Sequence, residues 1–254
     1  MENASRHKLS AILKSSKSVE ERSEEALQLI ESEGIVDIDL EMMRIGDYGA
    51  QALAIVLFRS NIIKRLYLDR NDITDVVAEF IAIGLEHSTT LTYLMLQVNY
   101  ISDDGAIALA AVIGRSPNLE SVILDRNRIG DSGALALATA ITSSKTLTYV
   151  DLYDNRIGNT GATALVSGLN HSFSLTTLDV SSNCITDEIL PACIRFLLRR
   201  NQDTKDRNER WFRRRQLLLI VKAIDMDDTL IATKPDLVAV FGNLAIVRTI
   251  AQYL

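Results

Sequence analysis

Residues 91–113 read LTYLMLQVNYISDDGAIALAAVI, and residues 119–141 repeat the pattern as LESVILDRNRIGDSGALALATAI. Aligned 28 residues apart, the two stretches share leucine, asparagine, isoleucine, glycine and alanine at matching positions. Internal similarity at a fixed period is typical of repeat architectures, in which each unit packs only on its neighbours. The same period, followed along the rest of the chain, therefore decides the fold.

Six units of 28 residues cover residues 35–202. Three apolar columns keep the register throughout: Ile38, Leu66, Leu94, Val122, Val150 and Leu178; Leu40, Leu68, Leu96, Leu124, Leu152 and Val180; and Ile45, Ile73, Ile101, Ile129, Ile157 and Ile185. An asparagine column contains Asn71, Asn99, Asn127, Asn155 and Asn183, with Met43 in the first unit. This regularity predicts one continuous solenoid.

Each unit changes its hydrophobic period halfway. The first part, such as LTYVDLYDN at 147–155, alternates apolar and polar residues and predicts a short strand with one buried face. The second part, such as DSGALALATAITSS at 131–144, has apolar residues at helical spacing. An acid or amide opens each helical part, and we expect it to cap that helix: Asp47, Asp75, Asp103, Asp131, Asn159 and Asp187. We expect each strand-exit asparagine to bridge backbone groups of adjacent units.

A strand–helix unit with the pattern LxxLxLxxNxI resembles the leucine-rich repeat. The quoted stretches are similar to the ribonuclease-inhibitor-like subfamily, which is also found in NOD-like receptors and in the Ran GTPase-activating protein. The resemblance covers about two-thirds of the chain. It implies an α/β solenoid curved like a horseshoe, with a parallel sheet on the concave face, helices on the convex face and helical caps. Because the subfamily includes inhibitors, receptors, scaffolds and regulators, the function stays open.

Both ends of the repeat array need caps, since terminal units expose apolar faces. Residues 1–34 are predicted to form the N-terminal cap, because SVEERSEEALQLIES at 18–32 is helical in pattern without the repeat consensus. Residues 203–254 leave the repeat and are predicted to form a helical C-terminal cap. There we expect a charged helix near 204–223 and a last helix from about Pro235.

The composition restricts the class of protein. Hydrophobic residues make up 47% and charged residues 24%, which is typical of a globular chain. The apolar stretches are shorter than the roughly 20 residues of a membrane span, so no span is expected. Two cysteines and a start without an apolar leader favour a reduced, cytoplasmic protein. A net charge of −6 argues against nucleic acid as a partner.

One motif suggests an enzyme. Asp225, Asp227 and Thr229 match a DxDxT signature and resemble the phosphatase loop of haloacid-dehalogenase-like enzymes. In that family the first aspartate is the nucleophile and the second is the acid/base. The chemistry needs a much larger doubly wound domain, whereas only 24 residues follow Leu230. We therefore expect a turn between two helices and no enzyme activity.

Metal and cofactor sites are not expected either. His87 and His171 occupy the same repeat position three units apart, so they cannot share a metal, and both are predicted to be exposed on outer helices. Cys184 and Cys193 have neither CxxC nor zinc-finger spacing. Neither pair therefore predicts a metal centre.

Residues 195–222 contain ten lysines and arginines against three acids. Such a segment can hold phosphates, an acidic partner or an anionic membrane surface. Acid–base pairs four residues apart, such as Asp203 with Arg207 and Glu209 with Arg213, favour a solvated capping helix instead. A cap and a second binding site both stay open.

Strand residues outside the core point into the concave face, where we place the candidate binding site. Its apolar centre consists of Tyr67, Tyr93, Met95, Ile123 and Tyr149. Eight acids surround the centre, namely Asp37, Asp39, Glu41, Asp69, Asp125, Asp151, Asp154 and Asp179, and Arg70, Arg126 and Tyr153 lie beside them. Aromatic anchors within a charged rim are typical of protein-binding sites. The β-propensity of tyrosine explains only part of this pattern, because it does not account for Met95 and Ile123.

The sequence therefore favours an intracellular protein-interaction module or scaffold without catalysis. Its partner is expected to be a protein that binds the concave face and is basic where it meets the rim. One alternative is a regulator of a small GTPase, by resemblance to the Ran GTPase-activating protein, with Arg70 and Arg126 near a phosphate; the long acidic tail of that family is absent. Another is a microbial effector acting on host proteins. The oligomeric state stays open.

Overall fold

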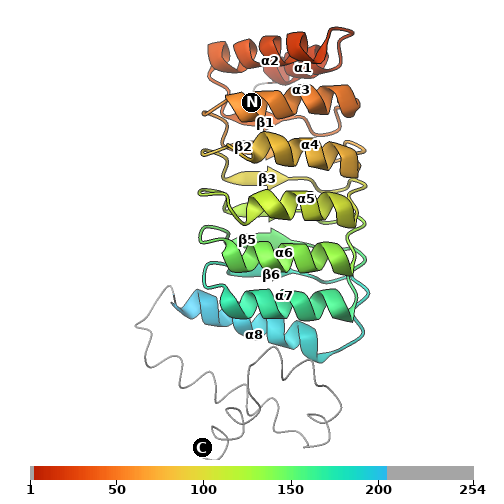
Figure 1. The fold of residues 1–254 in the computed structure, drawn as a ribbon, viewed down its shortest axis with the longest axis vertical. Helices are drawn as coiled ribbons and strands as arrows, with labels where there is room; N and C mark the ends of the chain where they lie inside the picture. The colour runs from red at the N-terminus through yellow and green to blue at the C-terminus, as the bar shows by residue number, and fades with distance from the viewer. Residues whose placement is uncertain (1–2, 205–254) are drawn as a thin grey trace, which may run out of the picture.

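The computed structural model describes residues 3–204 (Figure 1). Several sequence predictions lie outside the described residues: most of the C-terminal cap at 203–254, most of the basic segment at 195–222, the DxDxT motif, and the helix from Pro235. The structure therefore tests the repeat core and the N-terminal helices.

Six short strands alternate with helices. The strands are β1 (Asp37–Asp39), β2 (Arg65–Tyr67), β3 (Tyr93–Met95), β4 (Ser121–Ile123), β5 (Tyr149–Asp151) and β6 (Thr177–Asp179). The helices are α1 (Asn3–Leu13), α2 (Val19–Glu33), α3 (Gly46–Arg59), α4 (Asp75–Leu85), α5 (Asp103–Ile113), α6 (Asp131–Ser143), α7 (Asn159–His171) and α8 (Ile189–Thr204). Neighbouring strands pair in parallel and in chain order, and the helices stack beside them in the same order (Figure 1). The predicted α/β solenoid is confirmed.

The core runs as one continuous layer between the sheet and the helices. In each strand the central residue is buried and its two neighbours keep some exposure. Leu66, Leu94 and Leu124 are fully enclosed. The helices approach closely because small residues face the neighbouring helix. A Cβ added at Gly84 of α4 would lie 2.6 Å from the carbonyl oxygen of Ala54 in α3.

The asparagine column links successive units as predicted. Asn99 Oδ1 accepts the backbone N–H groups of Asn71 at 3.0 Å and Ile73 at 2.9 Å. Its amide nitrogen donates to the carbonyl oxygens of Leu68 and Leu96 at 3.0 and 2.9 Å. Buried polar backbone groups in the turns therefore find partners in the next unit.

The prediction that each helix-opening acid caps its own helix is wrong in the central units. The N-cap residues of α5 and α6 are Ser102 and Gly130, and neither has a side-chain cap bond. Asp103, the first residue of α5, instead accepts the N–H groups of Gly130 at 2.7 Å and Gly133 at 2.8 Å, at the start of α6. Because the acid stands one position beyond the N-cap, its carboxylate reaches the following unit.

Three other members of this column follow two patterns. Asp75 and Asp131 bond the start of the following helix in the same way as Asp103. Asp187 accepts the N–H of Ile189 at 2.9 Å and so serves its own helix, α8. The capping ladder therefore links α4 to α5, α5 to α6 and α6 to α7.

Helix α1 packs on the first unit with Leu9 and Leu13, which are both fully buried. Arg6 donates to the carbonyl oxygen of Glu41, and Lys14 Nζ donates to that of Met43 at 3.1 Å. These two cations donate to carbonyl groups that follow β1, the first strand of the sheet, which has no preceding strand to supply donors.

At the other end of the described residues, α8 covers the turn before β6. Arg200 donates to the carbonyl oxygens of Leu169 at 2.9 Å and Ser172 at 2.8 Å, and Asn201 donates to Leu175 at 2.7 Å. Within residues 3–204, every helix is too short or too polar to cross a membrane.

Candidate functional site

The register of the sheet assembles the predicted apolar centre. On the concave face, which points away from the helices, Met95 lies opposite Tyr67 on one side and Ile123 on the other. The rings of Tyr67 and Tyr93 are 5.2 Å apart, centroid to centroid. Four of the five residues predicted for the apolar centre lie together on β2, β3 and β4 and are partly exposed, and from here the name apolar centre refers to these four. Tyr149 is separated from Tyr93 by Ser121 of β4.

The first two predicted rim acids are compensated by arginines of the same chain. Arg65 Nε lies 2.8 Å from Asp37 Oδ1 and its Nη2 lies 2.5 Å from Oδ2, which lowers the pKa of Asp37. Arg6 Nε lies 3.3 Å from Asp39 Oδ1. The sequence alone does not indicate Arg6 as a site residue, because it belongs to α1 and no repeat position marks it.

Two other predicted rim acids are buried, which corrects the sequence interpretation. Asp69 and Asp125 are each only 7% exposed. Burial, followed by repulsion from Glu41, raises the pKa of Asp69 to about 6. Burial, followed by repulsion from Asp151, raises the pKa of Asp125 to about 6. An alternating pattern places such side chains outside the apolar core, but it does not encode how far neighbouring strands enclose them.

Asp151 and Asp179 lie on β5 and β6 and have no cationic partner among the described residues. Asp151 Oδ1 accepts the N–H of Tyr153 at 2.9 Å, and Asp179 Oδ1 accepts the N–H of Ser181 at 2.8 Å. Neither forms an ion pair within 4.0 Å with any described residue. The hydroxyl of Tyr149 donates to Asp151 Oδ2 at 3.3 Å, and burial followed by Asp151 raises the pKa of Tyr149.

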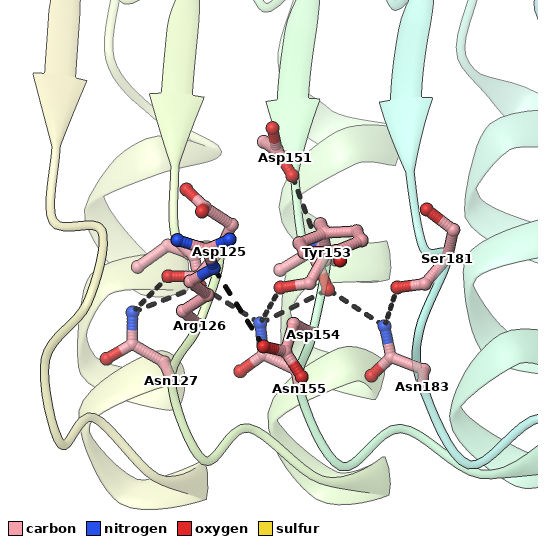
Figure 2. A network of polar contacts seen from close by, with 11 residues as sticks. Asp125, Arg126, Asn127, Asp151, Tyr153, Asp154, Asn155, Ser181 and Asn183 are labelled. Atoms are coloured by element: carbon pink, nitrogen blue, oxygen red, sulfur yellow. Dashed lines mark hydrogen bonds and ion pairs between the residues drawn. The ribbon is translucent and has the colours of Figure 1, made fainter.

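The two predicted site arginines stand at strand exits. Arg126 lies 5.9 Å from the ring centroid of Tyr153, and its Nε lies 3.9 Å from Asp154 Oδ2. Figure 2 shows Arg126 reaching from the exit of β4 toward Asp154 at the exit of β5. Arg70 is exposed and forms no ion pair within the described part of the chain.

The side chains that suggested other chemistry are dispersed. His87 and His171 are exposed on the helix side, as predicted, and the ring of His87 lies 4.6 Å from that of Phe58. Cys184 is exposed and Cys193 is partly buried, and burial raises the pKa of the Cys193 thiol. Between residues 3 and 204, no group of three His, Cys, Asp or Glu side chains is placed to hold a metal ion.

Comparisons with known proteins agree with this architecture. A family model described as "Leucine Rich repeat" matches residues 87–110, 115–138, 143–166 and 171–191. The sequence has no match among curated proteins. A solved structure of leiomodin-1 actin-binding site 2 (ABS2) is similar with a TM-score of 0.54 and 22% identity, over 67% of this chain and 95% of that chain. At this identity the likeness concerns the fold alone. The repeating strand–helix units, the asparagine ladder and these matches together show that the fold is a leucine-rich-repeat solenoid.

Proposed function

We propose that this protein is an interaction module whose partner protein docks on the concave face. The observation that carries the proposal is the apolar centre, in which Tyr67, Met95 and Ile123 are adjacent across three strands and partly exposed. Aromatic and aliphatic side chains of this kind, surrounded by polar groups, act as anchors in protein interfaces. Each such anchor contributes about 2 kcal/mol or more when a partner buries it.

The finer assignments made from the sequence belong to the same proposal. The 28-residue unit supports the ribonuclease-inhibitor-like subfamily. The packing of α1 on the first unit supports an N-terminal cap at residues 1–34, and residues 203–254 are proposed as the C-terminal cap. Two free cysteines support a reduced, cytoplasmic setting. A scaffold without catalysis is the function most consistent with these features.

Affinity capture tests the proposal. The intact protein and the double variant Tyr93→Ala with Tyr149→Ala are used as baits in the same lysate, and the captured partner is then titrated against both. We expect the double variant to bind at least about tenfold more weakly while unfolding at the same temperature. His87→Ala, on the helix side, serves as the control and should bind like the parent.

A different pattern of binding would place the functional surface elsewhere. If the double variant binds as tightly as the parent, and reversal of the Arg213, Arg214 and Arg215 charges abolishes binding, the functional surface is the basic segment. The concave-face proposal then falls.

A second candidate function is regulation of a small GTPase. Arg70, at the exit of β2, favours it, because this side chain is exposed and forms no ion pair with a described residue. Arg126, by contrast, is engaged by Asp154 and Tyr153. A panel of small GTPases with the parent and Arg70→Ala tests it, since a regulator should accelerate hydrolysis and the variant should not. Filamentous actin belongs in the same panel, because the structural neighbour is by its title an actin-binding site.

A further inference from the structure

Charge is distributed unequally along the concave face. At the β1 end, Asp37 and Asp39 are paired with Arg65 and Arg6. At the β6 end, Asp151 and Asp179 pair with no described cation, although their backbone hydrogen bonds resemble that of Asp39. Glu41 and Asp69, which follow β1 and β2, also lack a described cation, but among the acids within the strands themselves the unpaired ones lie on β5 and β6.

A buried carboxylate lies beside these unpaired acids. Asp125 follows β4, is 7% exposed, and accepts no side-chain hydrogen bond from a described residue. Arg126 attracts it without forming an ion pair within 4.0 Å, and Asp151 repels it. Asp69, the equivalent residue two units earlier, instead shares a hydrogen bond with Glu41. Asp125 accepts a hydrogen bond from its own backbone N–H. Because a carboxylate can accept several hydrogen bonds, Asp125 can take a further donor.

Aromatic groups complete the surroundings of this acid. Tyr149 interacts electrostatically with Asp125, Asp151 and Asp179, and its hydroxyl bonds Asp151. Figure 2 shows Asp125, Asp151 and Tyr153 on adjacent strands at the same end of the sheet. Carboxylates beside aromatic rings are suited to a lysine ammonium or an arginine guanidinium.

We propose, resting on the function proposed above, that Asp125, Tyr149, Asp151 and Asp179 form a subsite for one lysine or arginine side chain of the partner protein, while the apolar centre takes an apolar side chain of the same segment. The observation that selects this occupant is charge complementarity: the acids nearest the apolar centre on the β6 side are the ones without a cationic partner among the described residues.

The strand spacing sets the distance between the two anchors. The apolar centre is centred on β3 and the cation subsite on β5, two strands away. Neighbouring strands lie about 4.8 Å apart, so the anchors are separated by about 10 Å. A polyproline II segment advances about 3.1 Å per residue with three residues per turn, so side chains three positions apart lie on the same side and about 9 Å apart. The partner segment therefore carries its apolar and basic residues three positions apart, in either chain direction.

Three synthetic peptides serve as probes. The first is acetyl-Gly-Leu-Gly-Gly-Arg-Gly-amide, the second has citrulline in place of arginine, and the third places arginine directly after leucine. Binding to the intact protein is followed through the NMR signals of the Met95 and Ile123 methyl groups. Because only two contacts are made, a Kd in the range of about 1 mM is expected for the first peptide.

Matched variants locate the charge effect. Asp179→Asn and Asp39→Asn both keep an oxygen that accepts a backbone N–H two residues on, and each removes one negative charge. We expect Asp179→Asn with Asp151→Asn to raise the Kd of the arginine peptide by about fivefold and to leave the citrulline peptide unchanged. Asp39→Asn should change neither. The citrulline and shortened peptides should bind the parent about fivefold more weakly than the first peptide. Thermal unfolding of each variant shows that it is folded.

Three outcomes overturn the subsite. They are equal binding of the arginine and citrulline peptides, an equal effect of Asp39→Asn and Asp179→Asn, and the absence of any methyl shift at about 10 mM peptide. The proposed function is judged separately with the captured partner. If Tyr93→Ala weakens that partner and Asp151→Asn with Asp179→Asn does not, the cation subsite is wrong and the concave-face proposal stands.

Discussion

At the residue scale, each unit holds one strand-exit residue in the left-handed region of backbone space. Met42, Arg70, Val98, Arg126, Asp154 and Ser182 have φ between 51° and 58°. L-residues other than glycine, asparagine and aspartate rarely adopt this conformation, and a β-branched residue is the least suited to it. The turn is repeated because the asparagine ladder and the parallel sheet together require it. Val98 is therefore a site of local strain.

Replacing Val98 with asparagine should relieve that strain. We expect Val98→Asn to increase the free energy of unfolding by about 1 kcal/mol, because asparagine tolerates a positive φ. Urea unfolding followed by circular dichroism measures the change. Val76→Asn, at an exposed helical position with ordinary φ, is the control and should not stabilise. A loss of stability in Val98→Asn would show that the contacts of the valine side chain outweigh its strain.

Asp125 gives a pH-dependent prediction. Its pKa is about 6 in the folded protein and about 3.9 in an unfolded chain, so between pH 4 and 6 the folded state holds a proton that the unfolded state has lost. Parent stability therefore falls as the pH rises through this window. Asp125→Asn removes the titration and should stabilise the protein by about 1 kcal/mol above pH 6, with little effect below pH 4.

Asp37→Asn is the control of opposite sign. Arg65 lowers the pKa of Asp37, so the ionised acid stabilises the folded state above pH 4, and the contribution is lost as the pH falls through the lowered pKa. The variant should therefore be less stable than the parent at pH 7 and similar to it in strong acid. Urea titrations at several pH values distinguish the two signs, and equal behaviour of both variants would refute the burial argument.

At the element scale, the helices are joined by a ladder of acids that cap the following helix. Asp103 belongs to α5, yet it supplies the acceptor for two N–H groups at the start of α6. Unsatisfied N–H groups at a helix start cost free energy, so stacking one unit on the next removes a penalty that either unit would have alone. The ladder therefore contributes to coupling between neighbouring units.

Asp103→Ala should destabilise the protein by about 1–2 kcal/mol, because it leaves the N–H groups of Gly130 and Gly133 without an acceptor. Asp103→Asn should cost less, since Asn159 supplies an amide oxygen at the equivalent position. Asp104→Ala removes a neighbouring acid from the same first turn of α5 and is the matched control. Equal losses for Asp103→Ala and Asp104→Ala in urea unfolding would mean that only the dipole of α5 matters.

At the scale of the whole molecule, stability depends on one uninterrupted core shared by consecutive units. Leu124 lies in the fourth unit, is fully buried, and stands between Leu96 and Leu152 in its column. In such an array each unit is stabilised mainly by its two neighbours, so a defect in the middle separates the units on either side.

Leu124→Asp should abolish the single cooperative unfolding transition, because it buries an unpaired charge and costs at least about 4 kcal/mol. Ile123→Asp changes the adjacent residue, whose side chain is on the concave face and partly exposed, and should leave a cooperative transition. Differential scanning calorimetry compares the two. Unfolding of Leu124→Asp like that of the parent would contradict the register of the repeat.

The sequence by itself determined the repeating unit, the order and type of the elements from β1 to α7, and the rows of the candidate site. The strands follow from a hydrophobic period of about two residues, the helices from a period of 3.6 residues, and the repeat from the 28-residue spacing. All three patterns can be read directly from the sequence. Only the tertiary structure decided that Arg6 pairs with Asp39, that Asp69 and Asp125 are buried, and that Asp103 caps α6. Those features arise from side chains that meet across units, where enclosure and direction depend on how closely the units stack. The alternation of apolar and polar residues shows that a side chain lies outside the core. Its ion-pair partner depends on which side chains of neighbouring units lie close to it after the units stack.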